Sequence, residues 1–248
     1  MKLSATIVTL NEEPNIARAI ESLRCADEII VVDSGSTDRT CQIAEARGAR
    51  VVNESWRGYA AQKNFAAACA SYDWILSLDA DECLGEELEV EILDLKRLGP
   101  GHDAYQFPRL AQYLGRWIRH SGWYPDCKIR LYHREHGRWE GDYVHESVRI
   151  RGSIGRLNGH LLHFTCNSLG DHLRSIDRYT TLAARELHDR KAEVSLRHLT
   201  IDPFWALIRT YFVDRGFLDG PQGAAIAWMA ALYTFLKYAK ALELTGRM

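Results

Sequence analysis

The sequence predicts an α/β fold in which helices cover a mostly parallel sheet. Short runs of apolar and β-branched residues at 3–9, 28–32 and 50–53 are each followed by a polar loop and a segment with helical spacing. A further run starts at Trp74 and ends in carboxylates at Asp79. Strands that alternate with helices in this way form parallel sheets that are covered on both faces.

The spacing of apolar residues predicts the helices of this first part. They cover 16–23, a segment that carries Cys41, Ile43 and Ala44, the alanine-rich stretch 60–71, and 85–98. Ser36 or Thr37 is the expected N-cap of the second helix, because a hydroxyl can accept from free backbone amides there. Gly99, Pro100 and Gly101 stop the last helix and predict a boundary near residue 98.

From residue 104 to residue 166 the composition favours strands. Aromatic residues are interleaved with Arg and His over 104–151, and the segment 128–133 alternates charged and apolar residues as a half-exposed strand does. We expect most of these aromatic rings in the core and about a third of them against a ligand. The apolar run 161–164, which contains His163, is a further expected strand.

Residues 167–248 are expected to form a C-terminal helical extension. The segment 171–191 has amphipathic spacing, and the segments 204–213 and 223–244 are richer in Trp, Tyr and Phe. The uncharged stretch 224–236 is shorter than the roughly 20 residues that cross a bilayer. We therefore expect 223–244 to lie in the plane of a membrane surface, where aromatic and basic residues are favoured. We also expect the loop 215–220 to touch lipid or the acceptor. Packing against the rest of the chain or a partner subunit is the alternative.

The composition argues against several classes of protein. The chain has 248 residues, of which 46% are hydrophobic and 26% charged, as in a globular protein with a real core. A formal net charge of -2 argues against a nucleic-acid-binding protein. The six cysteines include no Cys-x-x-Cys pair, so we expect free thiols in the cytoplasm. The first apolar run breaks at 11–13, too early for a signal peptide.

The stretch from Trp74 to Glu82 carries the strongest chemical signal. Asp79 and Asp81 are two residues apart, so both side chains lie on one face of an extended strand. Carboxylates placed in this way suit Mg²⁺ or Mn²⁺ that carries a diphosphate. The alternative is an ordinary acidic turn at the end of a strand.

Polar loops follow several of the expected strands, at 9–13, 33–38 and 79–82. The carboxyl ends of parallel strands meet at one edge of a sheet, where ligands bind, so we expect these loops to form one crevice. This convergence favours the metal and diphosphate interpretation over the acidic turn. The sequence has neither a G-x-G-x-x-G motif after its first strand nor a Walker lysine loop, which argues against a dinucleotide cofactor and against an ATPase.

The motifs of the crevice, taken in order, resemble family 2 glycosyltransferases with the GT-A fold. They are Thr9-Leu10-Asn11-Glu12-Glu13, Val32-Asp33-Ser34-Gly35-Ser36-Thr37-Asp38, Gln62-Lys63-Asn64 and Leu78-Asp79-Ala80-Asp81-Glu82. The later stretches 144–146, 161–164 and 216–220 are similar to the lipopolysaccharide-core β-glucosyltransferase branch. The resemblance implies a UDP-sugar donor such as UDP-glucose, and inversion at the anomeric carbon. It also implies that 1–98 binds the nucleotide sugar and that 99–166 binds the acceptor.

The resemblance also implies nucleotide contacts for individual residues. Near the nucleoside it places Thr9, Asn11 and Glu12, with Glu13 as the alternative to Glu12. At the uracil or ribose edge it places Asp33 and Ser34. Ser34 departs from the many family members that have a second acid at this position, which puts the base contact in question. A turn or helix-capping role is the alternative for Asp33.

The remaining expected contacts surround the phosphates. Lys63 would approach the base or the phosphates, Asp79 would lie near the ribose, and Asp81 would hold the metal directly. His163 would complete the metal site or touch the diphosphate. The alternatives are a solvated helix charge for Lys63 and a core position for His163.

A transfer to a hydroxyl needs a carboxylate or imidazole that takes the acceptor's proton as the new bond forms. The resemblance implies an acceptor-side position for Glu146, and we expect Glu146 to be this base. Asp142 and Glu140 are the next candidates, and His145 would orient Glu146 or the donor. A surface pair of His145 and Glu146 without a catalytic role is the alternative.

We therefore expect an inverting glycosyltransferase that depends on Mg²⁺ or Mn²⁺ and moves a hexose from UDP to a lipid-linked saccharide. By resemblance the hexose is glucose and the acceptor is the lipopolysaccharide inner core. The expected location is the cytoplasm, with the inner leaflet of the cytoplasmic membrane as a further partner and no nucleic acid. The alternatives are a nucleotide-sugar-binding module without turnover, a metal-dependent phosphohydrolase and a sugar nucleotidylyltransferase.

Overall fold

The computed structural model describes residues 1–141, 146–166 and 168–246. The chain forms two compact units, of which the first contains Met1–Arg109 and Asp126–His163 and the second contains Leu110–Pro125 and Phe164–Met248. These units cut across the expected regions 1–98, 99–166 and 167–248, because the segment Leu110–Pro125 groups with the C-terminal helices.

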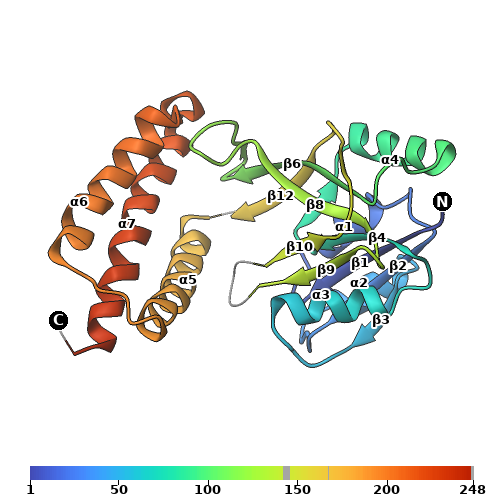
Figure 1. Ribbon diagram of the computed structural model, residues 1–248, viewed down its shortest axis with the longest axis horizontal. Helices are drawn as coiled ribbons and strands as arrows, with labels where there is room; N and C mark the ends of the chain where they lie inside the picture. The colour runs from blue at the N-terminus through green and yellow to red at the C-terminus, as the bar shows by residue number, and fades with distance from the viewer. Residues whose placement is uncertain (142–145, 167, 247–248) are drawn as a thin grey trace. The chain divides into compact units, whose positions relative to one another are not determined.

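The first unit alternates strands and helices along its amino-terminal part, as the sequence predicts (Figure 1). These elements are β1 (Leu3–Thr9), α1 (Ile16–Glu21), β2 (Glu28–Asp33), α2 (Thr40–Ala46), β3 (Arg50–Asn53), α3 (Tyr59–Ala68), β4 (Trp74–Asp79), β5 (Glu82–Leu84) and α4 (Glu86–Leu98). Strands then follow: β8 (Asp126–His133), β9 (Gly137–Glu140), β10 (Ser147–Ile150) and β11 (Ile154–Arg156). Two further strands, β6 (Ala104–Tyr113) and β12 (Leu161–Cys166), begin in this unit and end in the second.

The main sheet has the strand order β3-β2-β1-β4-β8-β6-β12-β5. β1 pairs in parallel with β2 and β4, and β2 pairs in parallel with β3. β8 runs antiparallel to β4 and β6, whereas β11 pairs in parallel with β6, so the later part of the sheet is mixed. β9 and β10 form a separate antiparallel pair. The parallel part is the part that the alternation of strands and helices predicts.

Alternate residues of the central strands bury opposite faces of the sheet. One core contains Leu3, Ala5 and Ile7 of β1, Leu76 and Leu78 of β4, and Leu88 and Ile92 of α4. The other core contains Ile30 and Val32 of β2, Ile75 of β4, Ala66 of α3, and Tyr132 and Trp139. Successive side chains of a strand point to opposite faces, and a parallel sheet is normally covered on both.

Strand register brings the polar loops to one edge of the sheet. Thr9 pairs with Asp33 across β1 and β2, and Val8 pairs with Asp79 across β1 and β4. The carboxyl ends of these parallel strands are therefore level with one another. We call the loops that follow them, at 10–15, 34–39 and 80–81, the rim.

The structure differs from the expected helix cap in one loop of the rim. α2 begins after Arg39, which is its N-cap, and not after Ser36 or Thr37. The hydroxyl of Ser36 instead accepts a hydrogen bond from the backbone amide of Asn11. A hydrogen bond between two loops has therefore replaced the expected local one. α4 ends as expected, at Gly99 with a φ of 90°, a conformation that glycine adopts readily.

The second unit is mainly helical. It contains β7 (Arg116–Trp117), α5 (Leu169–Asp189), α6 (Leu196–Ile208), the π-helix η1 (Arg209–Val213), the 3₁₀-helix η2 (Gly216–Asp219) and α7 (Gly220–Leu244). α5 and α6 both contact α7. Every helix in the described part of the chain is too short or too polar to cross a membrane.

Candidate active site

Hydrogen bonds join the first two loops of the rim. The amide of Asn11 donates to Ser36 Oγ at 2.7 Å, and the amide of Thr37 donates to Asn11 Oδ1 at 2.8 Å. The amide of Glu12 donates to Thr40 Oγ1 at 2.8 Å. Asn11 has a φ of 54°, in the left-handed region that Asn tolerates better than most residues. The loops that the sequence predicts to share a crevice are therefore physically connected.

Asp33 and Ser34 are both occupied within the protein. The buried carboxylate of Asp33 accepts from the amides of Gly35 and Ser36 at 2.8 and 2.7 Å, which is a turn role. Ser34 Oγ accepts from Gln62 Nε2 at 3.1 Å. A contact of Asp33 or Ser34 with a nucleotide stays a prediction.

The side chain of Thr9 forms no hydrogen bond with the described residues, whereas that of Glu13 is already paired. The buried hydroxyl of Thr9 has no hydrogen-bond partner among the described residues. Leaving a buried polar group unpaired costs free energy, so a ligand that pairs with this hydroxyl would gain affinity. Glu13, by contrast, already forms an ion pair with Arg39 at 2.6 Å.

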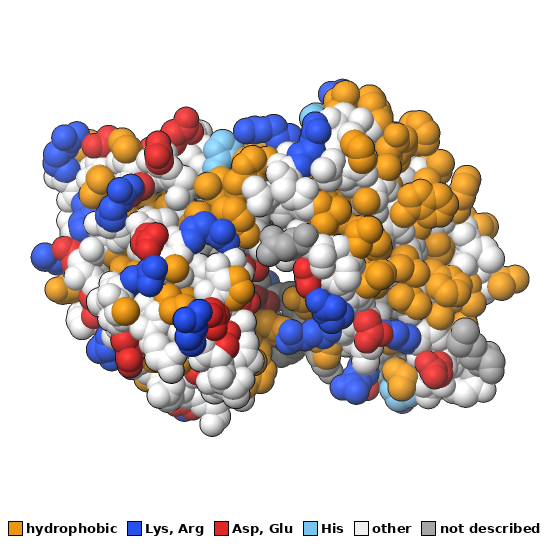
Figure 2. All heavy atoms as spheres, turned by 180° about the vertical axis from the view of Figure 1, so that it is seen from behind, with side chains coloured by type: hydrophobic (Ala, Val, Ile, Leu, Met, Phe, Trp, Pro, Cys, Tyr) orange, Lys and Arg blue, Asp and Glu red, His pale blue; other side chains and the backbone are white. Residues whose placement is uncertain are grey.

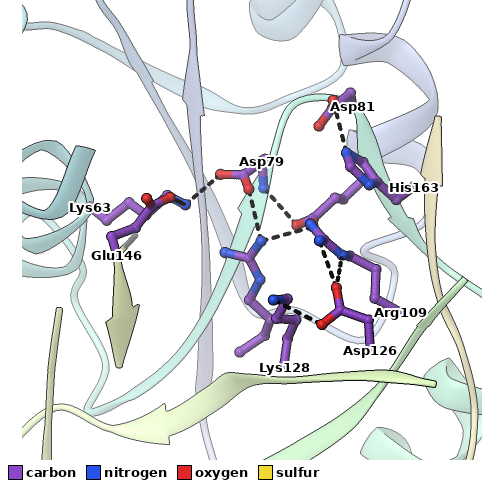
Figure 3. A network of polar contacts seen from close by, with 10 residues as sticks. Lys63, Asp79, Asp81, Arg109, Asp126, Lys128, Glu146 and His163 are labelled. Carbon is purple, nitrogen blue, oxygen red and sulfur yellow. Dashed lines mark hydrogen bonds and ion pairs between the residues drawn. The ribbon is translucent and has the colours of Figure 1, made fainter. Parts of the chain in front are cut away.

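Lys63 of α3 is turned toward two carboxylates (Figure 3). Its Nζ atom lies 2.8 Å from Asp79 Oδ1 and 3.0 Å from Glu146 Oε1, and its side chain is only 2% exposed. The same ammonium lies 4.5 Å from the centroid of the Trp139 ring, a cation–π contact. Lys63 is therefore not a solvated helix charge. It joins Asp79 to Glu146 and does not present its ammonium at an open surface.

Arg130 of β8 is a site residue that the sequence pattern does not predict. The alternation in 128–133 suggests an exposed charge, whereas Arg130 is 4% exposed. Its Nη2 atom donates to Asp79 Oδ2 at 2.7 Å and to Glu82 Oε1 at 2.8 Å. Glu82 is also buried and accepts from the amide of Asp79 at 3.0 Å. The sequence signal that could have indicated a buried cation is the density of acids in 79–82, because buried carboxylates need a positively charged partner.

These cations keep Asp79 ionised. Burial raises the pKa of the Asp79 carboxyl, but the charges of Arg130 and Lys63 and their hydrogen bonds outweigh burial and hold the pKa well below its usual range. Asp79 is therefore a fixed anion at the edge of the rim.

Asp79 and Asp81 do not share one face of a strand, contrary to the expectation from their spacing. β4 ends at Asp79, and Ala80 and Asp81 form the turn that leads to β5. Alternation of side chains applies only while the chain stays extended. Asp79 consequently binds Lys63 and Arg130, whereas Asp81 turns to His163.

His163 faces Asp81, so the structure brings together the two expected metal ligands (Figure 3). His163 pairs with Glu82 across β12 and β5, and its Nε2 atom lies 3.1 Å from Asp81 Oδ2. Burial lowers the pKa of His163, but the charge of Asp81 and the hydrogen bond to it outweigh burial and raise the pKa. A carboxylate oxygen and an imidazole nitrogen so placed are suitable ligands for a divalent metal ion.

Glu12 adds to the negative charge at the same place. Burial raises the pKa of Glu12, a hydrogen bond from Asn15 lowers it, and the charges of Asp81, Asp38 and Asp79 raise it further. Negative charge gathered in this way favours the binding of a cation. Acids from each of the three rim loops are therefore close enough to interact.

Glu146 is the expected catalytic carboxylate that the described structure brings, through Lys63, close to Asp79. Its side chain is 17% exposed and is bound by Lys63, whereas Glu140 is 59% exposed and lies 3.7 Å from Arg149. Asp142, the other expected catalytic acid, and His145 lie outside the described residues.

A different group of potential metal ligands lies at the opposite edge of the sheet. His133, Glu135 and His136 offer ligand atoms that lie within 4.8 Å of one another. His133 pairs with Trp74, at the amino end of β4, whereas Asp79 is at the carboxyl end of that strand. This group is therefore separate from Asp81 and His163.

Known proteins are similar to this chain in fold and in sequence. A mannosyltransferase, PcManGT from Pyrobaculum calidifontis, matches the structure with a TM-score of 0.56 over 97% of this chain and 87% of its own, at 16% identity. That likeness supports the expected GT-A fold. A family model described as glycosyl transferase family 2 matches residues 4–154.

Relatives are similar over nearly the whole chain. An uncharacterized glycosyltransferase of Rickettsia typhi, RT0209, is 34% identical over 98% of this chain and 88% of its own length. The lipopolysaccharide core biosynthesis glycosyltransferase LpsC of Rhizobium meliloti is 31% identical over 97% of this chain and 92% of its own length. Together with the family match over more than half of the chain, these relatives show that the protein belongs to glycosyltransferase family 2.

Proposed function

We propose that this transferase moves a hexose from a UDP-sugar to a saccharide that is linked to a lipid, with inversion at the anomeric carbon. The similarity to LpsC, which is named for lipopolysaccharide core biosynthesis, supports an acceptor of this kind. The motifs at 144–146, 161–164 and 216–220 favour glucose as the hexose and the lipopolysaccharide inner core as the acceptor.

The observation that carries this proposal is the facing pair of Asp81 and His163 beside the rim. One carboxylate oxygen and one imidazole nitrogen fit Mn²⁺ well and fit Mg²⁺ through the carboxylate. The structure of PcManGT is described in complex with GDP-Man and Mn²⁺. When bound by Asp81 and His163, a divalent ion supplies positive charge that stabilises the diphosphate leaving group.

Glu146 is the proposed base. A carboxylate within hydrogen-bond reach of the acceptor hydroxyl takes its proton while the hydroxyl oxygen bonds to the anomeric carbon and UDP leaves. The ammonium of Lys63, 3.0 Å from Glu146 Oε1, fixes the orientation of this carboxylate. We therefore assign Lys63 a positioning role through Glu146 and Asp79. This role differs from the expected direct contact of Lys63 with the base or the phosphates.

The nucleotide would lie along the rim. Thr9, at the carboxyl end of β1, stays a proposed nucleoside contact. Asn11 and Asp33 hold the shape of the rim loops through their hydrogen bonds, and any contact that they make with the nucleotide would use their remaining lone pairs. Asp79, fixed by Lys63 and Arg130, stays the proposed contact of the ribose.

We further propose that the reaction takes place in the cytoplasm, at the inner leaflet of the cytoplasmic membrane. The cysteines, among them the buried Cys25, Cys83 and Cys166, are free thiols, as is usual for proteins of a reducing compartment. The lipid-linked acceptor would be met at the membrane surface.

Release of the nucleotide from a panel of donors tests the proposed activity. With Mn²⁺, we expect release from UDP-glucose to exceed release from UDP-galactose, UDP-N-acetylglucosamine and GDP-mannose. Asp81→Ala should lower this release by about 100-fold or more, the usual scale for the loss of one charge-stabilising group. Asp94→Ala is the matched control, because Asp94 is 51% exposed on α4, and its rate should equal that of the wild type. Tight binding of UDP-sugars without release would instead identify a binding module.

Replacing Glu146 and Glu140 one at a time tests which of these two acids is the base. Glu146→Gln keeps the shape of the side chain but cannot take a proton, so we expect kcat for transfer to fall by about 100- to 10,000-fold. The KM for the donor should change little. Glu140→Gln alters an exposed acid of β9 and should leave kcat unchanged. If Glu140→Gln lost activity and Glu146→Gln kept it, Glu146 would not be the base.

A further inference from the structure

α6 packs against α7 but leaves several large apolar side chains exposed. None of its 13 residues, all of which the structure describes, is buried. Leu196, Ile201, Phe204 and Trp205 are exposed at 73%, 59%, 66% and 56%. Large apolar side chains that are exposed together on one helix indicate a surface of interaction. Something outside the described chain is therefore expected to cover α6.

The exposed apolar surface continues beyond α6. Phe212 and Val213 of η1 are 57% and 61% exposed, and Phe217 and Leu218 of η2 are 47% and 48% exposed. Trp228 of α7 is 67% exposed, and α7 contacts α6, η1 and η2. Figure 2 shows hydrophobic side chains gathered in a broad area over the C-terminal helices. We call this surface the helical patch, made of Leu196, Ile201, Phe204, Trp205, Phe212, Val213, Phe217, Leu218 and Trp228.

This surface includes Trp228 of the expected segment 223–244 and Phe217 and Leu218 of the expected loop 215–220. α7 buries Gly223, Ile226, Ala227, Ala239 and Ala241, so a large part of that helix packs within the second unit. α6, η1 and η2 supply most of the exposed side chains instead. Exposed apolar surfaces of this kind mark sites of interaction with proteins or membranes.

Arginines accompany the helical patch. Arg116 Nη2 donates to the carbonyl oxygen of Leu218 at 3.2 Å, which places its guanidinium beside η2. Arg215 is exposed between η1 and η2. The side chains of Arg197 and Arg209 are 72% and 65% exposed. Aromatic side chains with basic residues around them are the composition that favours the headgroup region of a bilayer.

The acids near the patch are already paired. Asp202 Oδ1 lies 3.4 Å from Arg197 Nε, and Asp214 Oδ2 lies 3.6 Å from Arg209 Nε. Within the described patch, the charge that remains to face a partner is therefore positive. A two-fold dimer through this patch would bring arginines toward arginines, because both copies would use the same surface. The phosphates of anionic lipids would neutralise these arginines instead.

We propose that the helical patch docks on the surface of a bilayer that contains anionic phospholipid, with α6, η1 and η2 in the headgroup region. The aromatic side chains enter the apolar boundary, and Arg116 and Arg215 meet lipid phosphates. This inference rests on the proposed function, because a lipid-linked acceptor lies at such a surface. It deepens that function by assigning the contact to specific side chains.

Co-sedimentation of the full chain with vesicles tests the docking. We expect the wild type to bind phosphatidylcholine vesicles that contain phosphatidylglycerol more tightly than pure phosphatidylcholine vesicles, and less tightly at high salt. The double substitution Phe204→Glu and Phe217→Glu should weaken binding by at least about tenfold, since it removes two large apolar groups and adds negative charge. Leu93→Glu with Leu98→Glu is the matched control, because both leucines are exposed on α4, and it should bind like the wild type.

Donor turnover and thermal unfolding are measured on the same samples. Loss of vesicle binding by the patch variant, with UDP release and unfolding temperature kept, supports docking through the patch independently of the chemistry. Equal binding to both kinds of vesicle, or wild-type binding by the patch variant, would overturn the inference. A wild-type dimer that ignores vesicles and that the patch substitutions convert to a monomer would also overturn it, in favour of a second copy.

Discussion

Lys63 and Arg130 are cations that the acidic motif does not itself contain. They come from α3 and β8 and bind the two oxygens of the Asp79 carboxylate. Charges as buried as these destabilise a fold unless each has a partner. Their pairing therefore fixes Asp79, and through Lys63 also Glu146, before any ligand arrives.

Removing the cation between these carboxylates should cost both stability and activity. Lys63→Met leaves Asp79 and Glu146 without their shared partner, so we expect the free energy of unfolding to fall by about 3 kcal/mol. We also expect kcat to fall, because Glu146 loses its fixed direction. Lys128→Met is the control, since Lys128 is 40% exposed in its pair with Asp126 and should cost less than about 1 kcal/mol. If Lys63→Met and Lys128→Met lowered the free energy of unfolding in urea equally, burial of Lys63 would not be the cause of the loss.

The residues of the site were predictable to different degrees. Asp81 lies in an acidic motif, and His163 lies in an apolar run far along the sequence. The family resemblance was needed to predict that these two residues meet, as they do. The burial of Arg130 does not follow, because its strand alternates charged and apolar residues like any half-exposed strand. Only its contacts with Asp79 and Glu82, which are distant in sequence, explain its place.

At the scale of elements, local pattern predicts strands better than it predicts turns. β1 and β3 have the bounds that their β-branched runs predict, Leu3–Thr9 and Arg50–Asn53. The turn after Asp79 and the cap of α2 differ from expectation, because contacts between loops decide them. Ser36, for example, binds Asn11 of another loop and does not cap α2.

Asp27 connects the first strand to the end of a helix. Its carboxylate accepts from the amide of Leu3 at 2.9 Å, and it pairs with Lys96 of α4 at 2.7 Å and with Lys2 at 2.8 Å. Burial raises the pKa of Asp27, but the hydrogen bonds from Lys2, Lys96 and Leu3 outweigh burial and hold the pKa below its usual range. The ionised form is therefore the one that stabilises the fold.

The sign of the pH dependence follows from this direction. Because the pKa of Asp27 in the folded state lies below the unfolded value of about 3.9, its contribution is fully present above that pH. The contribution is lost as the pH falls through the folded-state pKa. Asp27→Asn should lower the free energy of unfolding by about 2 kcal/mol near neutral pH, the usual scale for hydrogen bonds to a charged group. Urea unfolding should show the gap to the wild type shrinking below about pH 4, and a constant gap would contradict this assignment.

At the scale of the whole molecule, the two units contribute different parts of the proposed activity. The family match at 4–154 lies mostly in the first unit, which contains Asp81, His163 and Glu146. The second unit supplies the helical patch. The sequence predicts a helical extension with a membrane-facing part, but exposure along α6 and α7 depends on packing that only the folded chain defines.

Diffraction from crystals grown with UDP and Mn²⁺, recorded where manganese scatters anomalously, tests the central claim most directly. We predict a manganese peak at coordination distance from both Asp81 and His163, with the phosphates of UDP bound to the same ion. A peak at His133, Glu135 and His136 alone, or UDP bound while Asp81 and His163 keep their mutual hydrogen bond without an ion, would contradict the account.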